Sequence, residues 1–141
     1  MSLVTPNEGQ LELMANMLIT SGFTGYDYLI DLYQNNYTPV QASTASDFTI
    51  ATFSGYSQVT ATRADFVTPT TVSNQATTSL STNPLTWTCG VTGNTIYGYL
   101  VRSALSGKVL WAELLPAGPY TLVDGQIFEL NLNITLFGSN P

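Results

Sequence analysis

The sequence contains no histidine, the side chain that proteins use most often as a general base and as a metal ligand. Without histidine the chain cannot build a Ser-His-Asp triad or a Cys-His pair. Its single cysteine, Cys89, cannot form a disulfide within the chain, and one thiolate is too few for a structural zinc site. We therefore predict that the protein is not an enzyme and that it has no catalytic residue, cofactor or metal ion.

Positive charge is also scarce, because Arg63, Arg102 and Lys108 are the only cations and the net charge is −6. Proteins that bind nucleic acid neutralise phosphates with clustered lysine and arginine, and anionic membranes attract polybasic segments. No run approaches the roughly 20 apolar residues of a transmembrane helix, and no signal peptide is visible at the N-terminus. We predict neither direct nucleic-acid binding nor membrane binding.

Charged residues of either sign make up only 9% of the chain, against about 25% in typical globular proteins. Hydrophobic residues make up 44%, which is the opposite of the balance that keeps a chain disordered. Two interpretations remain. The protein either hides much of its surface against copies of itself or a partner, or it is a monomer covered in Thr, Ser, Asn and Gln. We favour assembly.

The 141 residues suit a single domain, 1–141, with an N-terminal arm and helix over 1–22 and a β-sandwich over 28–136. Thr5, Pro6 and Glu8 predict a helix start, because Thr5 can cap and Glu8 can complete a capping box. The predicted helix covers about 6–20, ends at Gly22 and is a candidate contact between subunits. Its apolar face would consist of Leu11, Met14, Ala15, Leu18 and Ile19.

Short strands separated by turn residues dominate the rest of the chain. The predicted strands cover 28–33, 56–62, 85–89, 95–102, 109–115 and 126–136, and 71–82 is a surface strand or a loop that orders on contact. Turn residues mark 93–94, 105–108 and 124–125. This pattern predicts a mainly all-β fold, an antiparallel β-sandwich of the jelly-roll or immunoglobulin-like type with one N-terminal α-helix. A small open barrel is the alternative.

The longest predicted strand, 126–136, alternates cleanly between apolar and polar residues. Because side chains alternate faces along a strand, one row enters a core and the other faces water or a neighbouring subunit. The inner row is Phe128, Leu130, Leu132, Ile134 and Leu136. The outer row is Glu129, Asn131, Asn133 and Thr135, with a single charge.

Several aromatic residues and the cysteine admit two interpretations each. Tyr97, Tyr99 and Trp111 could stack on a sugar or a partner if they shared an exposed sheet face. We favour the alternative that they fill the core. Cys89 shares its strand face with Leu85 and is predicted to be a buried, inert thiol.

A family resemblance covers most of the chain from about Leu29. The segments 94–99, 107–113, 118–120 and 124–125 are similar to the C-terminal half of small tailed-bacteriophage proteins, whose genes tend to lie among virion structural genes. The segments 32–36, 38–39, 47–48 and 53–56 resemble the same group. The matching residues are turn glycines and core aromatics, which support a fold and carry no catalytic role.

The resemblance implies a non-enzymatic virion structural protein, and within that group a capsid cement or decoration protein. Such a protein stabilises the phage head by bridging capsomers as a homo-oligomer, commonly a trimer. The implied partners are copies of itself and the major capsid protein or another virion protein, in a virion assembled in the bacterial host cytoplasm. The alternatives are a tail-associated or head–tail protein, or a receptor- or carbohydrate-binding module at a tail or fibre tip.

Overall fold

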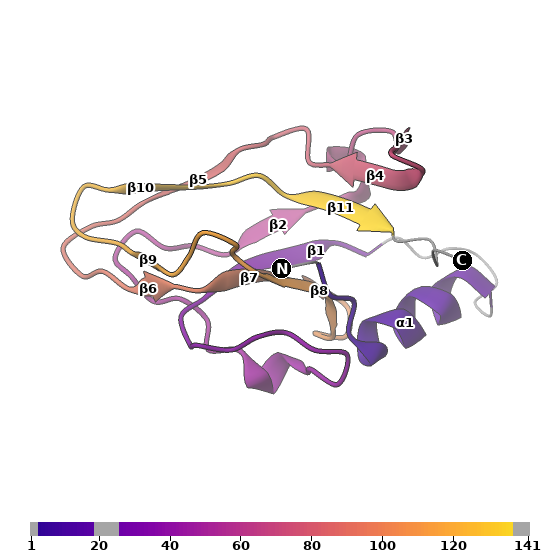
Figure 1. The fold of residues 1–141 in the computed structure, drawn as a ribbon, viewed down its shortest axis with the longest axis horizontal. Coiled ribbons are helices and arrows are strands. Elements are labelled where there is room, and N and C mark those ends of the chain that lie inside the picture. The colour runs from indigo at the N-terminus through magenta and orange to yellow at the C-terminus, as the bar shows by residue number, and fades with distance from the viewer. Residues whose placement is uncertain (1–2, 19–25, 137–141) are drawn as a thin grey trace.

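The computed structural model describes residues 3–18 and 26–136, which form one α-helix, two short 3₁₀ turns and a set of antiparallel strands (Figure 1). This confirms the predicted all-β fold with an N-terminal helix. The helix α1 covers Asn7–Leu18, and the 3₁₀ turns cover Ala45–Asp47 and Arg63–Asp65. The strands are β1 Tyr28–Tyr33, β2 Val59–Ala61, β3 Thr70–Val72, β4 Gln75–Ser79, β5 Leu85–Thr88, β6 Thr95–Ile96, β7 Gly98–Ser103, β8 Val109–Leu114, β9 Tyr120–Thr121, β10 Ile127–Leu130 and β11 Asn133–Leu136.

A four-stranded sheet with the order β2-β1-β7-β8 is the frame of the molecule. Its central strands β1 and β7 are buried on both faces, which explains why 28–33 reads as a nearly continuous apolar run. On one face Ile30 and Val101 enter the main core. On the other, Tyr33 and Leu100 pack with Phe48, which comes from the loop that follows β1.

A second layer lies across the main core from the four-stranded sheet and contains the sheet β11-β4-β3 and the pair β10-β5 (Figure 1). Its inner face meets the four-stranded sheet in one apolar cluster, and full burial of each large apolar side chain contributes about 1.5–3 kcal/mol. The second layer supplies Leu85, Trp87, Phe128, Leu130, Leu132 and Ile134, and the four-stranded sheet supplies Ile30, Leu32, Tyr99, Val101 and Leu110.

The long strand predicted over 126–136 is present as β10 and β11, with a break in the backbone ladder at 131–132. The side chain of Asn83 bridges this break. Its Nδ2 donates to the Leu132 carbonyl at 3.0 Å, and the Leu132 N–H donates to its Oδ1 at 3.1 Å. The alternation therefore continues across the break, with Phe128, Leu130, Leu132 and Ile134 buried. The Leu136 side chain lies outside the described part of the chain.

The turns follow the predicted residue chemistry. Gly107 in the β7–β8 hairpin has φ +74° and Gly125 before β10 has φ +83°, a region that glycine enters without strain. The segment 71–82 forms the surface hairpin β3–β4, whose turn residues Ser73 and Asn74 also have positive φ. The strand predicted over 95–102 is divided into β6 and β7, and that over 56–62 is reduced to the edge strand β2.

The helix α1 packs on β8 by a face other than its apolar one. A side chain at Gly9 would collide with the Val109 carbonyl, and the Glu8 carboxylate accepts the Val109 N–H at 2.8 Å. Leu13 packs against the main core. Leu11 and Met14 from the predicted apolar face are 68% and 57% exposed. Ile19 and Gly22, which belong to the same prediction, lie outside the described residues.

Candidate protein interface

The outward side of the second layer is a broad sheet surface, here called the outer face. The strand register shows which residues belong to the outer face. Residues that pair across antiparallel strands lie on the same face of the sheet, and every second residue along a strand returns to that face. The predicted outer row of β10 and β11 is confirmed as part of it. The outer face consists of Thr70, Val72, Gln75, Thr77, Ser79, Thr86, Thr88, Ile127, Glu129, Asn131, Asn133 and Thr135.

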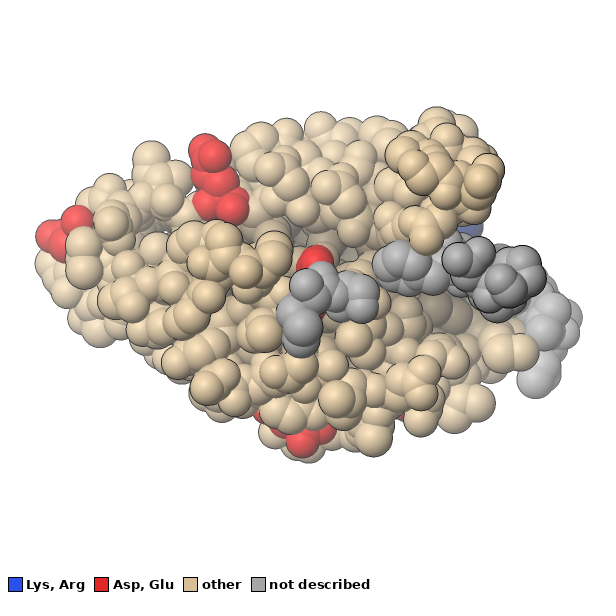
Figure 2. Space-filling model, viewed as in Figure 1, with Lys and Arg blue, Asp and Glu red and all other residues tan. Residues whose placement is uncertain are grey.

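The outer face is nearly free of charge, since Glu129 is its only ionisable residue. A soluble surface normally carries about 25–35% charged residues. The sequence reflects this directly, because no Asp, Glu, Lys or Arg occurs anywhere in 66–101, which includes β3, β4 and β5. In Figure 2 the surface over β3 and β4 is tan on the side toward the viewer, and a positively charged residue is visible only at its lower edge.

The side chains of the outer face are short and partly satisfied by one another. The hydroxyls of Thr77 and Thr135 lie 3.1 Å apart across the β4–β11 pair. Threonine and serine lose little rotamer freedom on burial compared with lysine or glutamate, and a neutral hydroxyl is far cheaper to desolvate than a charge. The outer face is therefore chemically suited to contact with another protein surface.

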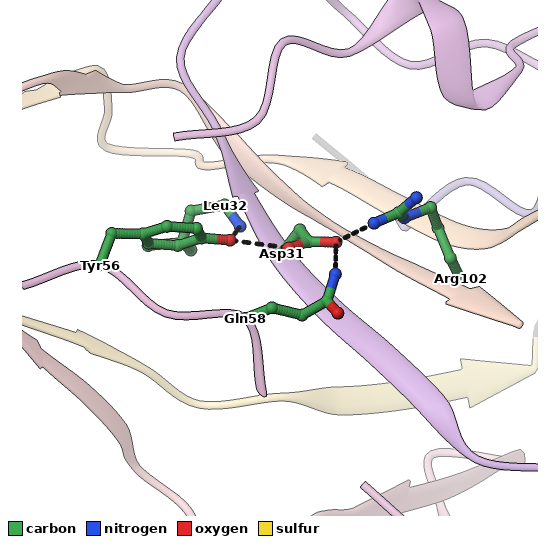
Figure 3. Close-up of polar contacts among 5 residues, drawn as sticks. All are labelled: Asp31, Leu32, Tyr56, Gln58 and Arg102. Atoms are coloured by element: carbon green, nitrogen blue, oxygen red, sulfur yellow. Dashed lines mark hydrogen bonds and ion pairs between the residues drawn. The ribbon is translucent and has the colours of Figure 1, made fainter. Parts of the chain in front are cut away.

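A second candidate site surrounds Asp31 on β1, the most buried carboxylate of the described chain at 1% exposure (Figure 3). Its Oδ1 accepts the Tyr56 hydroxyl at 2.8 Å, and its Oδ2 accepts Gln58 Nε2 at 2.7 Å and Arg102 Nη2 at 2.6 Å. Both carboxylate oxygens are thus occupied by protein donors. Such saturation is typical of a structural ion pair.

The cluster lies beside β1, just beyond the residues that pair with β2. The pairing of β1 with β2 stops at Ile30, so the next N–H on that edge needs another acceptor. The Tyr56 hydroxyl provides it, accepting the Leu32 N–H at 3.2 Å while donating to Asp31. Burial, followed by the nearby Asp31 carboxylate, raises the pKa of Tyr56 well above its usual value, which keeps the phenol protonated. The cluster thus satisfies the backbone of β1 at the point where its pairing with β2 ends.

Sequence reasoning does not find this cluster. Asp31 is one acidic residue within an apolar strand, and its three partners come from positions 25 to 71 residues further along the chain. No local spacing marks them as a group. Asn83 was missed for the same reason, since it contacts Leu132 across 49 residues.

The residues considered for ligand stacking or reactivity lie mostly inside the molecule. Tyr99, Trp111 and Cys89 are 2%, 8% and 1% exposed, which confirms that they belong to the core. Tyr97 is half-buried and packs against the smaller cluster around Phe48. These aromatics therefore form no exposed platform for a sugar.

An apolar cavity of about 420 Å³ lies between the two layers. Tyr28 and Trp111 of the four-stranded sheet line it on one side and Ile134 on the other, and Arg63 is the charged residue of its lining. Phe66, from the chain that follows β2, also contacts it. No carboxylate lines the cavity in the described residues, so its chemistry suits an apolar group.

Nowhere in 3–18 and 26–136 do three or more acidic or cysteine side chains gather as metal ligands would. No helix in those ranges is long and apolar enough to cross a membrane. Comparison of the chain with protein-family models, with curated proteins and with solved structures gave no match in any of the three.

Proposed function

We propose that this chain is a non-enzymatic virion structural protein of the capsid cement or decoration kind. The observation that carries the proposal is the outer face, a sheet surface with Glu129 as its only charge. The sequence resemblance to tailed-phage virion proteins supplies the biological setting. The proposed partners are further copies of the chain and the major capsid protein or another virion protein.

In this role the protein bridges its neighbours by burying neutral and apolar surface. Ile127, which is 63% exposed, and Val72, which is 56% exposed, supply apolar contacts within the outer face. Because few ion pairs take part, added salt screens little of the binding energy. We expect attachment to persist at salt concentrations that detach proteins held by charge.

Location in the particle tests the proposal directly. An antibody raised against the purified chain should label intact virus particles in electron microscopy, on the head surface. Label confined to the tail would support the head–tail alternative, and the absence of label from particles would overturn the virion role.

A charge placed within the outer face tests whether that surface makes the contact. Thr88→Arg adds a cation on β5, where the side chain is exposed, so the free energy of unfolding should change by no more than about 0.5 kcal/mol. If the surface is buried on attachment, an unpaired charge there costs several kcal/mol, and binding to particles should weaken by more than about tenfold.

Thr60→Arg is the matched control, because Thr60 is also an exposed threonine on a strand but belongs to β2 of the four-stranded sheet. Cosedimentation of each variant with particles that lack the protein gives the comparison. Equal binding by both variants would exclude the outer face as the contact surface.

A further inference from the structure

The two layers differ in whether another segment of the chain covers the edge of their outermost long strands. In the four-stranded sheet, Val4 exchanges two backbone hydrogen bonds with Ala112 of β8, at 2.8 and 2.9 Å, and Glu8 accepts the Val109 N–H. The N-terminal segment thus covers the β8 edge. In the second layer, no hydrogen bond of the described chain reaches the far side of β10 and β11. We call that side the free edge.

The direction of the backbone groups on the free edge follows from two hydrogen bonds near its two ends. The Cys89 N–H donates to the Gln126 carbonyl at 2.7 Å, and the Leu132 N–H donates to Asn83 Oδ1 at 3.1 Å. Backbone groups alternate in direction along an antiparallel ladder, so the even-numbered residues point toward β5 and β4. The outward N–H and C=O groups therefore belong to Ile127, Glu129, Asn131, Asn133 and Thr135.

Within the described residues, the free edge carries neither of two common features that prevent strand addition, lysine and proline. Natural edges are protected by lysine, proline, a bulge or a covering segment, and 127–135 contains no lysine or proline. A groove of about 490 Å³ runs beside β10, with Tyr120, Ile127 and Glu129 among its lining residues. Tyr120 is 40% exposed and Ile127 is 63% exposed, so an added strand would cover apolar surface as well as backbone.

We propose that the free edge pairs antiparallel with the same edge of a second copy, about a two-fold axis at Asn131. This inference rests on the self-association included in the proposed function. In that register Ile127 faces Thr135 of the partner copy, and Glu129 faces Asn133. The only charge of the edge therefore meets a neutral amide, and the edge is complementary to itself. The β11 strand of each copy would cover the groove beside β10 of the other.

Other pairings fit less well. The opposite edge of the second layer, β3, has only three residues and directly follows Pro69, so it offers a shorter ladder. A trimer formed by joining the free edge of one copy to β3 of the next would leave most of β10 unpaired. An extended segment of an unrelated protein could occupy the same edge, and the experiments below separate these cases.

Proline at the axis tests the backbone pairing. Asn131→Pro removes an outward N–H and none of the bonds to β5 or β4, whereas Asn131→Ala keeps the N–H and removes only the amide. Light scattering after size exclusion should give a dimer for the original chain and for Asn131→Ala. The dissociation constant of Asn131→Pro should rise by about tenfold or more. Circular dichroism identifies any variant that fails to fold.

Two charge changes test the register without disturbing the backbone. Asn131→Asp places two carboxylates opposite each other at the axis, so the dimer should dissociate at neutral pH and return as those groups are protonated. Asn133→Lys places an ammonium opposite Glu129 of the partner copy and should tighten the dimer by a few-fold. A charge effect of the same sign for both changes would overturn the register.

The outcomes separate this inference from the proposed function. A trimer, or a dimer indifferent to Asn131→Pro and to Asn131→Asp, overturns the edge pairing while particle labelling can still succeed. A monomer that labels heads overturns self-association but leaves the virion role. If the chain forms a dimer that responds to the substitutions as expected, but the antibody labels no particle, the edge pairing stands and the virion role is refuted.

Discussion

The two layers share one core but differ in their other surfaces. The four-stranded sheet is covered on its far face by the loop that carries Phe48, and the N-terminal segment covers the β8 edge. Its Asp31 cluster supplies, through the Tyr56 hydroxyl, a hydrogen-bond partner for β1 where the pairing with β2 ends. The second layer buries only its inner face and leaves a neutral outer face and a free edge. The first layer therefore has more of its strand surface covered by the rest of the chain, and the second leaves more of it exposed.

The largest loss of stability is expected from removing the Asp31 carboxylate in the four-stranded sheet. Asp31→Ala leaves the half-buried Tyr56 hydroxyl and the Arg102 guanidinium, whose side chain is 23% exposed, without their acceptor, and breaking a buried pair from one side costs about 3–5 kcal/mol. Urea denaturation measures the free energy of unfolding. Asp124→Asn, at an exposed turn carboxylate, is the control and should cost no more than about 0.5 kcal/mol. Similar values for both would show that the cluster contributes little.

The core shared by the layers should be the next most sensitive region. Leu132 is fully buried, so Leu132→Ala should cost about 2–5 kcal/mol through lost apolar contact and the cavity that remains. The neighbouring Asn131→Ala, on the exposed outer row, provides the control in the same denaturation experiment. A loss below about 1 kcal/mol at Leu132 would contradict the tight packing between the layers.

A smaller loss is expected from removing the Asn83 side chain, which hydrogen-bonds to the backbone at the break between β10 and β11. Asn83→Ala removes the acceptor of the Leu132 N–H, whereas the Leu132 carbonyl keeps the Leu80 N–H at 3.3 Å, so one buried group is left unpaired at a cost of about 1–3 kcal/mol. Hydrogen exchange should show faster exchange of the Leu132 amide in this variant. Unchanged exchange at Leu132, with unchanged stability, would mean that the bridge is dispensable.

The sequence predicted local patterns well and convergence of distant residues poorly. The alternation over 128–135 correctly separated core from surface, because periodicity alone decides which face a strand residue occupies. It could not show that the ladder breaks at 131–132, since Asn83 supplies the bridge from elsewhere. The helix illustrates the same limit. Its apolar residues Leu11 and Met14 share a face, but the close approach at Gly9 decides which face packs on β8.

The smallest effect is a dependence of stability on alkaline pH that belongs to the four-stranded sheet. Burial, and then the nearby Glu113 carboxylate, raise the pKa values of Tyr33 and Tyr99 well above the ordinary value of 10.0. Above about pH 10 the unfolded chain releases these protons while the folded chain keeps them, so rising pH favours unfolding. Below that pH these two groups contribute no slope.

The free energy of unfolding should therefore fall above pH 10 by up to about 1.4 kcal/mol per pH unit for each such tyrosine. Urea denaturation at a series of pH values measures the slope. Tyr99→Phe removes one of the two groups, along with its hydrogen bond to Glu113, and should give a lower stability at neutral pH but a shallower alkaline slope. An unchanged slope in Tyr99→Phe would show that this tyrosine ionises as readily in the folded protein as in the unfolded chain. The sheet would then be open to water at β7, where the structure places its most buried strand residues.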